Sequence, residues 1–325
     1  MIGITSGDPN GVGPEILLRA YQSKKLLYPS FTIGDYEVLK YCNNHLHLEV
    51  PLYKMTSTSD MQSGYLNVLD AGILSEKDLS IGKISAKGGQ ASLKYIDRAV
   101  ELAIKGDIEA IVTLPVNKEA IRIDKKNFKG HTDYIAAHCN VSNFCMMLVS
   151  DKLIVTHLST HLSLKEALGR IKKERIIDVI RLTHDAVSKL RPRVRIAVAG
   201  LNPHAGEHGA FGTEEMNEIE PAVLEARSVG MDIYGPVPPD TVFVQAVHGK
   251  FDAVVCMYHD QGHIPMKLLD FENAVNVTLG LPVLRTSVDH GTAYDIAYQG
   301  KASIQSFCYA FRLAQQLMSA DFSHG

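Results

Sequence analysis

The chain has 325 residues, of which 46% are hydrophobic and 21% charged, and its net charge is −3 at pH 7. This length exceeds what a single hydrophobic core usually serves, so it predicts two domains. The charge balance argues against a nucleic-acid or membrane-surface partner. Five scattered cysteines without a CxxC pair, and no apolar run near the roughly 18 residues of a membrane span, favour a cytoplasmic protein.

Short apolar runs alternate with longer amphipathic segments, which is the pattern of an α/β fold with buried, mostly parallel strands. In chain order the pattern predicts helices at 14–21 and 90–105, strands at 110–114 and 152–156, one or two helices at 164–190, a strand at 194–199, a helix at 214–229, and strands at 253–257 and 274–278. Ser163 and Glu166 form the sequence signature of a capping box. Gly106 and Gly230 stand where two helices should end in a left-handed residue.

Three predicted strands run directly into loops that carry histidines. The pairs are His157 and His161 after 152–156, His204 and His208 after 194–199, and His259 and His263 after 253–257. Ligands of parallel sheets bind outside the carboxyl ends of the strands, so three such loops can present a three-histidine metal site. Zn²⁺ suits these ligands best, with Mg²⁺ or Co²⁺ as alternatives. The competing interpretation is that each histidine is an ordinary hydrogen-bonded loop residue, because no fixed local spacing links them.

Glycine-containing loops stand at three further places. The cluster at 130–133 precedes a helical pattern, and it is either an anion site of free backbone N–H groups or a helix start capped by Thr132 or Asp133. At 290–293 small residues allow a ligand to approach the backbone, although an ordinary turn before Tyr294 has the same pattern. The loop at 6–14 matches neither GxGxxG nor a P-loop, and a tight turn is its simplest interpretation.

These stretches resemble the 4-hydroxythreonine-4-phosphate dehydrogenase family of vitamin B6 biosynthesis. The matching motifs are GDPNGVGPE at 7–15, GHTDYIA at 130–136, GLNPHAGE at 200–207, MYHDQG at 257–262, VNVTLGLP at 275–282, and the segment 285–293. The family is related to isocitrate and isopropylmalate dehydrogenases, which implies two α/β/α domains with a cleft between them rather than a Rossmann domain. We therefore expect an NAD-loop domain of residues 1–125 and 283–325, and a metal, substrate and dimerisation domain of residues 126–282.

The resemblance also implies roles for individual residues. It implies metal binding by His161, His204 and His259, substrate binding by His131, Thr132, Lys267, Asn276 and Arg285, and NAD binding by His290, Gly291, Thr292 and Ala293. We assign the metal to His161 rather than His157 because His161 precedes an apolar–small–apolar triplet, as the family ligand does. Lys267 is the first candidate for the proton carrier and Asp260 the second. The family relationship implies a homodimer with the active site at its interface, to which the partner subunit can contribute His161.

The implied reaction is the NAD- and divalent-metal-dependent oxidation and decarboxylation of a phosphorylated hydroxy acid. The first candidate substrate is 4-phosphohydroxy-L-threonine, which would give 3-amino-2-oxopropyl phosphate for pyridoxal phosphate biosynthesis. The stretches QGHIPMKLL at 261–269 and STHLSL at 159–164 resemble instead a sister branch that acts on D-threonate or D-erythronate 4-phosphate. A three-histidine metal hydrolase and a non-catalytic metabolite-binding protein are alternatives of other classes, and neither of them would produce NADH.

Overall fold

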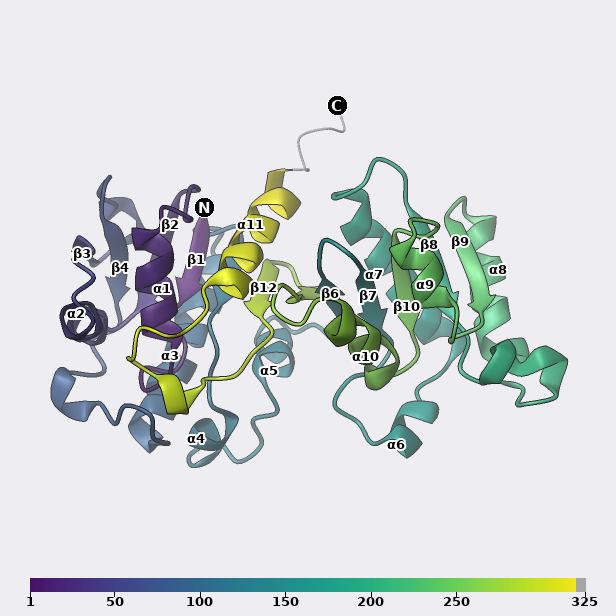
Figure 1. Ribbon diagram of the computed structural model, residues 1–325, viewed down its shortest axis with the longest axis horizontal. Helices are drawn as coiled ribbons and strands as arrows, with labels where there is room; N and C mark the ends of the chain where they lie inside the picture. Colours follow the sequence, from purple (N-terminus) through teal and green to yellow (C-terminus); the bar gives the residue numbers. More distant parts are fainter. Residues whose placement is uncertain (320–325) are drawn as a thin grey trace. The chain divides into compact units, whose positions relative to one another are not determined.

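The computed structural model describes residues 1–319, and the chain divides into two compact units (Figure 1). Unit 1 comprises Met1–Ser142 and Leu281–Met318, and unit 2 comprises Asn143–Gly280. The first boundary therefore follows residue 142 rather than the expected residue 125. The reason is that Phe128, Tyr134 and Ile135 belong to the hydrophobic core of unit 1. Residues 320–325 of the expected first domain lie outside the described part.

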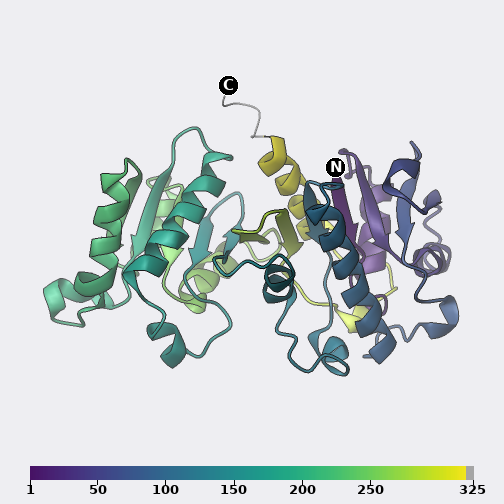
Figure 2. The same ribbon diagram turned by 180° about the vertical axis from the view of Figure 1, so that it is seen from behind.

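Unit 1 contains a parallel sheet with the strand order β3-β4-β2-β1-β5-β12. Its strands are β1 (Ile2–Thr5), β2 (Ser30–Gly34), β3 (Leu52–Met55), β4 (Leu66–Asp70), β5 (Ala110–Thr113) and β12 (Leu284–Val288). Its helices are α1 (Gly13–Gln22), α2 (Tyr36–His45), α3 (Ala86–Ile104), α4 (Lys118–Arg122), α5 (His131–His138) and α11 (Gln305–Ser319). Helix α3 packs on β1, β2 and β5, and α1 and α11 lie on the opposite face of the sheet (Figures 1 and 2).

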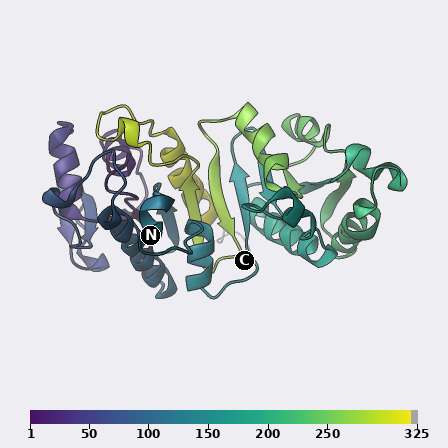
Figure 3. The same cartoon turned by 90° about the horizontal axis from the view of Figure 1, so that it is seen from below.

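In unit 2 the strand order is β11-β6-β7-β10-β8-β9, and Figure 3 shows helices on both sides of these strands. Its strands are β6 (Cys145–Val149), β7 (Ile154–His157), β8 (Arg195–Ala199), β9 (Asp232–Val237), β10 (Ala253–Cys256) and β11 (Val275–Leu279). Its helices are α6 (Leu164–Leu168), α7 (Lys173–Ser188), α8 (Glu220–Ser228), α9 (Val242–Val247) and α10 (His259–Leu269). Helices α7 and α8 pack against each other, whereas α9 and α10 pack on β10.

The prediction of mostly parallel strands is confirmed, with one exception in unit 2. Strand β6 runs antiparallel to both β7 and β11, because the tight turn from Ser150 to Leu153 reverses the chain directly into β7. The predicted helix at 214–229 is a π-helical turn at Glu215–Ile219 followed by α8. Among residues 1–319, no helix combines the length and apolar character that a bilayer crossing requires.

The predicted helix signals are confirmed where side chains or backbone angles can be compared. Ser163 accepts a hydrogen bond from the Glu166 amide at 3.3 Å, and the Glu166 carboxylate accepts from Ser163 in return. Gly106 follows α3 with φ of 78°, and Gly230 follows α8 with φ of 90°. Both glycines therefore end their helices in the left-handed conformation that only a residue without a Cβ adopts easily.

Candidate active site

The three histidine-bearing loops leave neighbouring parallel strands of unit 2. Strand β10 pairs with β7 on one side and with β8 on the other, and Cys256 at its end is in register with His157. The carboxyl ends of these strands therefore lie at one edge of the sheet, which is where ligands of parallel sheets bind. His259 itself differs from its predicted loop position, because it is the first residue of α10. The amide N–H groups of this helix start face the same edge.

Four histidines form a cluster in unit 2, which we call the histidine cluster: His157, His161, His259 and His263. His157 is buried, and its Nδ1–H donates to the carbonyl oxygen of Met146 at 3.3 Å. Its Nε2 consequently accepts from Nδ1 of His263 at 3.1 Å. Burial lowers the pKa of His157 to about 3, and the neighbouring His263 contributes in the same direction. Both ring nitrogens of His157 are thus engaged inside unit 2.

His259 is held differently from His157. Its ring stacks on His263 with centroids 3.5 Å apart, and its Nδ1–H donates to the carboxylate of Asp260 at 2.6 Å. That hydrogen bond leaves Nε2 as the nitrogen with a lone pair, in the pattern by which a carboxylate orients a metal-binding histidine. The ring of the exposed His161 lies 6.0 Å from that of His259, and both line a surface pocket of about 300 Å³ together with Tyr258 and Leu164.

His204 lies in an unusual turn, residues 203–209, that we call the His204 turn. Five consecutive residues of this turn, from His204 to His208, have positive φ between 42° and 79°. Such a left-handed run is strained for residues other than glycine, by roughly 1–2 kcal/mol each. It is held by the buried Glu215, whose carboxylate accepts from the amides of Leu201 and Asn202, both at 2.7 Å. The imidazole of His204 is exposed.

The chain supplies imidazole donors of the right kind for a divalent ion, and two of them lie close together. The 6.0 Å separation of the His161 and His259 rings is compatible with two imidazoles bound to one ion by bonds of about 2.0–2.1 Å. Within residues 1–319 of one chain, however, no three His, Cys, Asp or Glu side chains converge on a common metal position. Donor chemistry therefore fits the expected metal, although the described part of the single chain does not bring three such side chains together.

Unit 1 contains a different kind of site, formed by His131, Thr132 and Arg285, which we call the anion site. The Arg285 side chain on β12 is only 2% exposed. Its Nη1 donates to the Thr132 hydroxyl at 3.1 Å and its Nη2 to the Thr113 hydroxyl at 2.8 Å. Burial lowers the pKa of Arg285 to about 9, because the charged form loses its hydration. An anion next to this guanidinium would restore the stability of its charged form.

His131 completes the anion site at the first turn of α5. Its Nε2 atom is buried and has no hydrogen-bond partner among residues 1–319. Burial lowers the pKa of His131 well below its usual value, and the positive charges of Arg285 and Lys118 lower it further. Neither Thr132 nor Asp133 caps α5, since the helix begins after Gly130 without any side-chain cap. Of the two interpretations of this segment, the capping one is therefore wrong.

The other predicted substrate and proton-carrier residues all lie in unit 2. Asn276 is a buried residue of β11 whose Oδ1 has no hydrogen-bond partner in the described part of the chain. Lys267 is half-buried on α10, with its ammonium 4.9 Å from the ring centre of Phe271. Asp260 is exposed and holds His259, as described above. The anion site thus gathers only three of the five predicted substrate residues within unit 1.

The predicted NAD loop lies in unit 1, where the loop at 6–14 supports it. The Val12 amide donates to the carbonyl of Thr292 at 3.0 Å, and a Cβ on Gly11 would stand only 2.9 Å from Thr292. The Tyr294 hydroxyl donates to the buried Asp8 carboxylate at 2.7 Å. Gly291 is exposed, and a Cβ placed on it would meet no protein atom within 4 Å. The loop is therefore held by contacts with the loop at 6–14 and is open to solvent at Gly291, which fits a nucleotide-binding surface.

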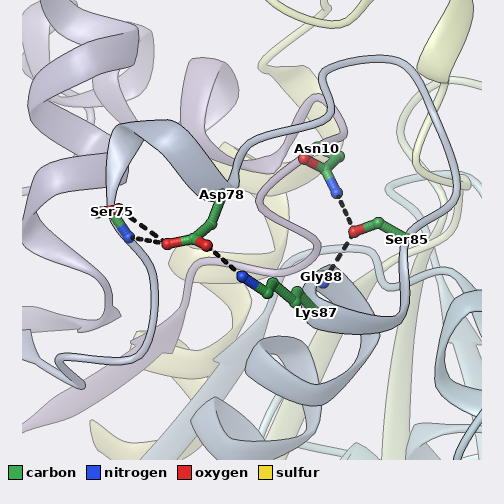
Figure 4. Close-up of polar contacts among 6 residues, drawn as sticks. All are labelled: Asn10, Ser75, Asp78, Ser85, Lys87 and Gly88. Carbon is green, nitrogen blue, oxygen red and sulfur yellow. Dashed lines mark hydrogen bonds and ion pairs between the residues drawn. The ribbon is translucent and has the colours of Figure 1, made fainter.

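A second loop strengthens this support through Asn10. The Asn10 side chain accepts from the Ser80 amide at 2.7 Å and donates to the Ser85 hydroxyl at 3.0 Å. Ser85 in turn caps α3 by accepting from the Gly88 amide, as Figure 4 shows. The loop at 6–14 is therefore a tight turn with buried polar contacts, in agreement with its simplest interpretation from the sequence.

Two residues that contact the predicted site were not identified from the sequence. Glu215 and Thr113 are not part of any motif that we singled out, although each bonds a predicted site residue or the loop that carries one. Glu215 lies in the charged run after Gly212, where its acidic neighbours make it look like a surface residue. Thr113 is the last residue of β5, inside the strand predicted at 110–114, and a polar residue near a strand end is the signal that would have identified it.

Comparisons with known proteins show which family this chain belongs to. The family described as "Pyridoxal phosphate biosynthetic protein PdxA" matches residues 27–314. D-threonate 4-phosphate dehydrogenase of Salmonella typhimurium is 43% identical over 321 residues, which cover 97% of this chain and 98% of the relative. The crystal structure of 4-hydroxythreonine-4-phosphate dehydrogenase from Klebsiella pneumoniae has a TM-score of 0.86 at 39% identity, covering 98% of this chain and 99% of that one.

A more distant likeness concerns the fold alone. Isocitrate dehydrogenase from Methylococcus capsulatus aligns with a TM-score of 0.50 at 13% identity, covering 99% of this chain and 85% of that chain. This similarity confirms the predicted fold class of an isocitrate dehydrogenase-like α/β protein. The family match spans most of the sequence and includes the motifs around His131, His204 and His259. The chain therefore belongs to the pyridoxal phosphate biosynthetic protein PdxA family, as its motifs predict.

Proposed function

We propose that the protein is an NAD-dependent dehydrogenase that oxidises and decarboxylates D-threonate 4-phosphate. Oxidation of the C3 hydroxyl transfers a hydride to NAD⁺ and releases one proton, which gives a β-keto acid. Loss of the C1 carboxyl group as CO₂ then gives dihydroxyacetone phosphate. The observation that carries the proposal is the anion site. There the buried guanidinium of Arg285 and the Nε2 atom of His131, which has no hydrogen-bond partner in the described part of the chain, suit a negatively charged group.

The phosphate fits the anion site for geometric and electrostatic reasons. Arg285 presents donors from a planar group, which matches phosphate oxygens, and Thr132 beside it adds a hydroxyl. Neutral His131 can donate from a ring N–H to a phosphate oxygen, because its lowered pKa keeps it uncharged near neutral pH. Binding energy from the phosphate, remote from the reacting carbon, then serves to orient the hydroxyl that is oxidised.

We further propose that His161, His204 and His259 hold a divalent ion, with Zn²⁺ as the first choice. Such an ion lowers the pKa of a bound hydroxyl and offsets negative charge as it develops during oxidation and decarboxylation. Asp260 positions His259 through its Nδ1–H, so Asp260 is better suited to this task than to proton transfer. Lys267 lies eight residues after His259, on the same side of α10, and is our candidate to accept the hydroxyl proton.

The cofactor and the assembly complete the proposal. NAD⁺ would bind the open side of the loop His290, Gly291, Thr292 and Ala293, where it accepts the hydride. A homodimer would supply the imidazole that one chain lacks at the metal position, as the family relationship implies. We place the reaction in the cytoplasm, in keeping with the free cysteines among the described residues.

The choice of substrate rests on the relatives. The 43% identity to a D-threonate 4-phosphate dehydrogenase over nearly the whole chain supports D-threonate 4-phosphate as the first candidate. The likeness to a 4-hydroxythreonine-4-phosphate dehydrogenase at 39% identity favours 4-phosphohydroxy-L-threonine as the second. Both carry a carboxylate, a C3 hydroxyl and a terminal phosphate, so they differ only in a hydroxyl or an amino group at C2.

The proposal is tested by NADH absorbance with the purified protein, Zn²⁺ and each substrate in parallel. We expect D-threonate 4-phosphate to give NADH and equimolar dihydroxyacetone phosphate, and 4-phosphohydroxy-L-threonine to give at least tenfold lower kcat/KM. Removal of the metal by a chelator should abolish the signal, and added Zn²⁺ should restore it. Phosphate release or ligand binding without any NADH would instead support a hydrolase or a binding protein and would overturn the proposal.

A further inference from the structure

Lys118 stands at the edge of the anion site without a recognised role. It is the first residue of α4, and its Cε and Nζ lie 3.4 and 3.5 Å from where a Cβ on Gly130 would be. Gly130 precedes the first turn of α5, which carries His131 and Thr132. The Lys118 ammonium therefore lies beside the amino-terminal end of α5, on which the anion site is built.

The backbone that carries Lys118 is firmly placed. The amide of Asp8 donates to the carbonyl of Pro115 at 2.9 Å, and a Cβ on Gly7 would stand only 2.5 Å from that carbonyl oxygen. Asn117 caps α4 by accepting from the Ala120 amide at 2.9 Å. Only the flexible side chain of Lys118 can therefore move, and its end is already directed toward Gly130.

The Lys118 side chain has no acidic partner in the described part of the chain. Other lysines of the protein, such as Lys87 with Asp78 (Figure 4) and Lys54 with Asp70, form ion pairs with carboxylates. Among residues 1–319, Lys118 forms neither an ion pair nor a hydrogen bond. It faces instead His131, whose pKa it lowers together with Arg285. An ammonium group without an ion pair, close to a second cationic side chain, suits an anionic ligand.

A charge balance shows why one more cation is needed. A phosphate monoester carries about −1.5 to −2 charges at pH 7. Arg285 provides one positive charge, and the amino-terminal end of a helix adds the equivalent of about +0.5. His131 adds none in its neutral form. The anion site thus falls about half a charge short of a fully ionised phosphate, and a single additional ammonium group would more than offset that difference.

We propose that Lys118 is a phosphate-binding residue of the anion site, and that it sets the preference of this site for dianionic phosphate over singly charged groups. This inference deepens the proposed function and rests on it for the identity of the phosphorylated substrate. Because Lys118 is exposed, its ammonium remains hydrated before the ligand arrives and loses little on binding. Lys118 thus complements Arg285, which is buried and fixed.

The test compares full-length Lys118→Gln with wild type, with Lys118→Arg as the conservative variant and Lys126→Gln as the matched control. Lys126 is another exposed lysine between α4 and α5 that makes no contact in the described part of the chain. Calorimetric titration with inorganic phosphate at pH 7.5 and at pH 5.5 measures binding of the mostly dianionic and mostly monoanionic ion. We expect Lys118→Gln to weaken binding about tenfold at pH 7.5 and less at pH 5.5.

A second measurement uses the enzyme reaction. Lys118→Gln should lower kcat/KM for D-threonate 4-phosphate about tenfold and leave that for unphosphorylated D-threonate unchanged, whereas Lys118→Arg should restore most of the loss. Equal losses for both substrates, or phosphate affinity equal to that of wild type, would overturn the role of Lys118. If phosphate binding depends on Lys118 but no substrate yields NADH, the inference stands and the proposed reaction fails.

Discussion

The anion site of unit 1 and the histidine cluster of unit 2 are built in contrasting ways. The hydroxyl groups of Thr132 and Thr113 each accept a hydrogen bond from Arg285 inside a single unit, and the guanidinium is buried. In the histidine cluster His157 is equally buried, but His161 is exposed, as is His204 in its separate turn, and no complete triad forms in the described part of one chain.

This difference indicates how each region reaches its working geometry. The anion site is preorganised, so a ligand does not have to order its side chains on arrival. The histidine region has a hydrogen-bonded support, consisting of His157, His263 and the carboxylate of Glu215, next to the exposed imidazoles of His161 and His204. Variants of the first region should therefore change ligand binding in the isolated chain, whereas variants of the second should change metal affinity.

The largest effect is expected from His204→Ala. This change removes one of three proposed metal ligands from an exposed position, so the fold should survive while metal binding fails. We expect kcat/KM to fall by at least about 10²–10³-fold, because the electrostatic stabilisation of the developing charge is lost. Metal content by mass spectrometry and NADH formation measure the two effects.

The matched control is His208→Ala, which alters another exposed histidine with positive φ in the same turn. It should retain its metal and most of its activity. His161→Asn should behave like His204→Ala, whereas His157→Asn should keep most of the metal, since both ring nitrogens of His157 bond within unit 2. Full metal content in His204→Ala would remove that residue from the site.

A smaller effect is expected from Glu215, which acts on the His204 turn without touching the metal. Glu215→Ala removes the acceptor for the Leu201 and Asn202 amides, so the left-handed turn should relax. Supporting residues of this kind typically change metal affinity about 10–100-fold. Glu215→Gln retains one carbonyl oxygen for these amides and should recover much of that loss. Competitive Zn²⁺ titration gives the affinities. An unchanged Zn²⁺ affinity in the folded Glu215→Ala variant would show that Glu215 does not support metal binding through the His204 turn.

The two regions also differ in how far the sequence could predict them. The hydrophobic pattern located the strands whose ends carry histidines, because a short apolar run marks each of β7, β8 and β10. It could not show that His259 begins α10, since Tyr258 lacks a capping side chain and gives no start signal. The support from Glu215 was also invisible, because it depends on a π-helical turn and on a left-handed run of ordinary residues.

In unit 1 the sequence predicted the members of the anion site but not their unit. The boundary after residue 125 separated His131 from Arg285, although the two belong together. The packing of Phe128 and Tyr134 into the core of unit 1 decides the matter, and such long-range packing leaves no local pattern. The resemblance supplied the residue roles, while the structure supplied their grouping.

Acid should weaken unit 1 through His131. The pKa of this residue is lowered in the folded protein, so folded His131 stays neutral while the unfolded chain takes up a proton below about pH 6.5. Its contribution to stability is therefore present above pH 6.5 and is lost as the pH falls. Between pH 7 and pH 5 the loss reaches up to about 2 kcal/mol.

His131→Asn removes this titration, so its stability should depend less on pH than that of wild type over the same range. Urea unfolding at pH 7.0 and 5.0, in buffer without phosphate or metal, measures how the free energy of unfolding of each protein changes with pH. His138→Asn is the control, because His138 is a partly exposed residue at the other end of the same helix. Identical slopes in wild type and His131→Asn would show that His131 is not held neutral.

The smallest effect is expected at Gly291. This prediction separates the exposed side of the loop at 290–293, where NAD⁺ is proposed to bind, from the loop at 6–14 that supports it. A Cβ at Gly291 meets no protein atom within 4 Å, so Gly291→Val should fold with the stability of wild type. Its side chain would instead occupy the space where NAD⁺ is proposed to lie. We expect the KM for NAD⁺ to rise about tenfold, equivalent to about 1.4 kcal/mol, with metal content unchanged. Gly11→Ala provides the opposite case, because its Cβ would stand 2.9 Å from Thr292 and should lower stability as well as NAD⁺ binding. A normal KM for NAD⁺ in Gly291→Val would place the nucleotide elsewhere, whatever Gly11→Ala does to the fold.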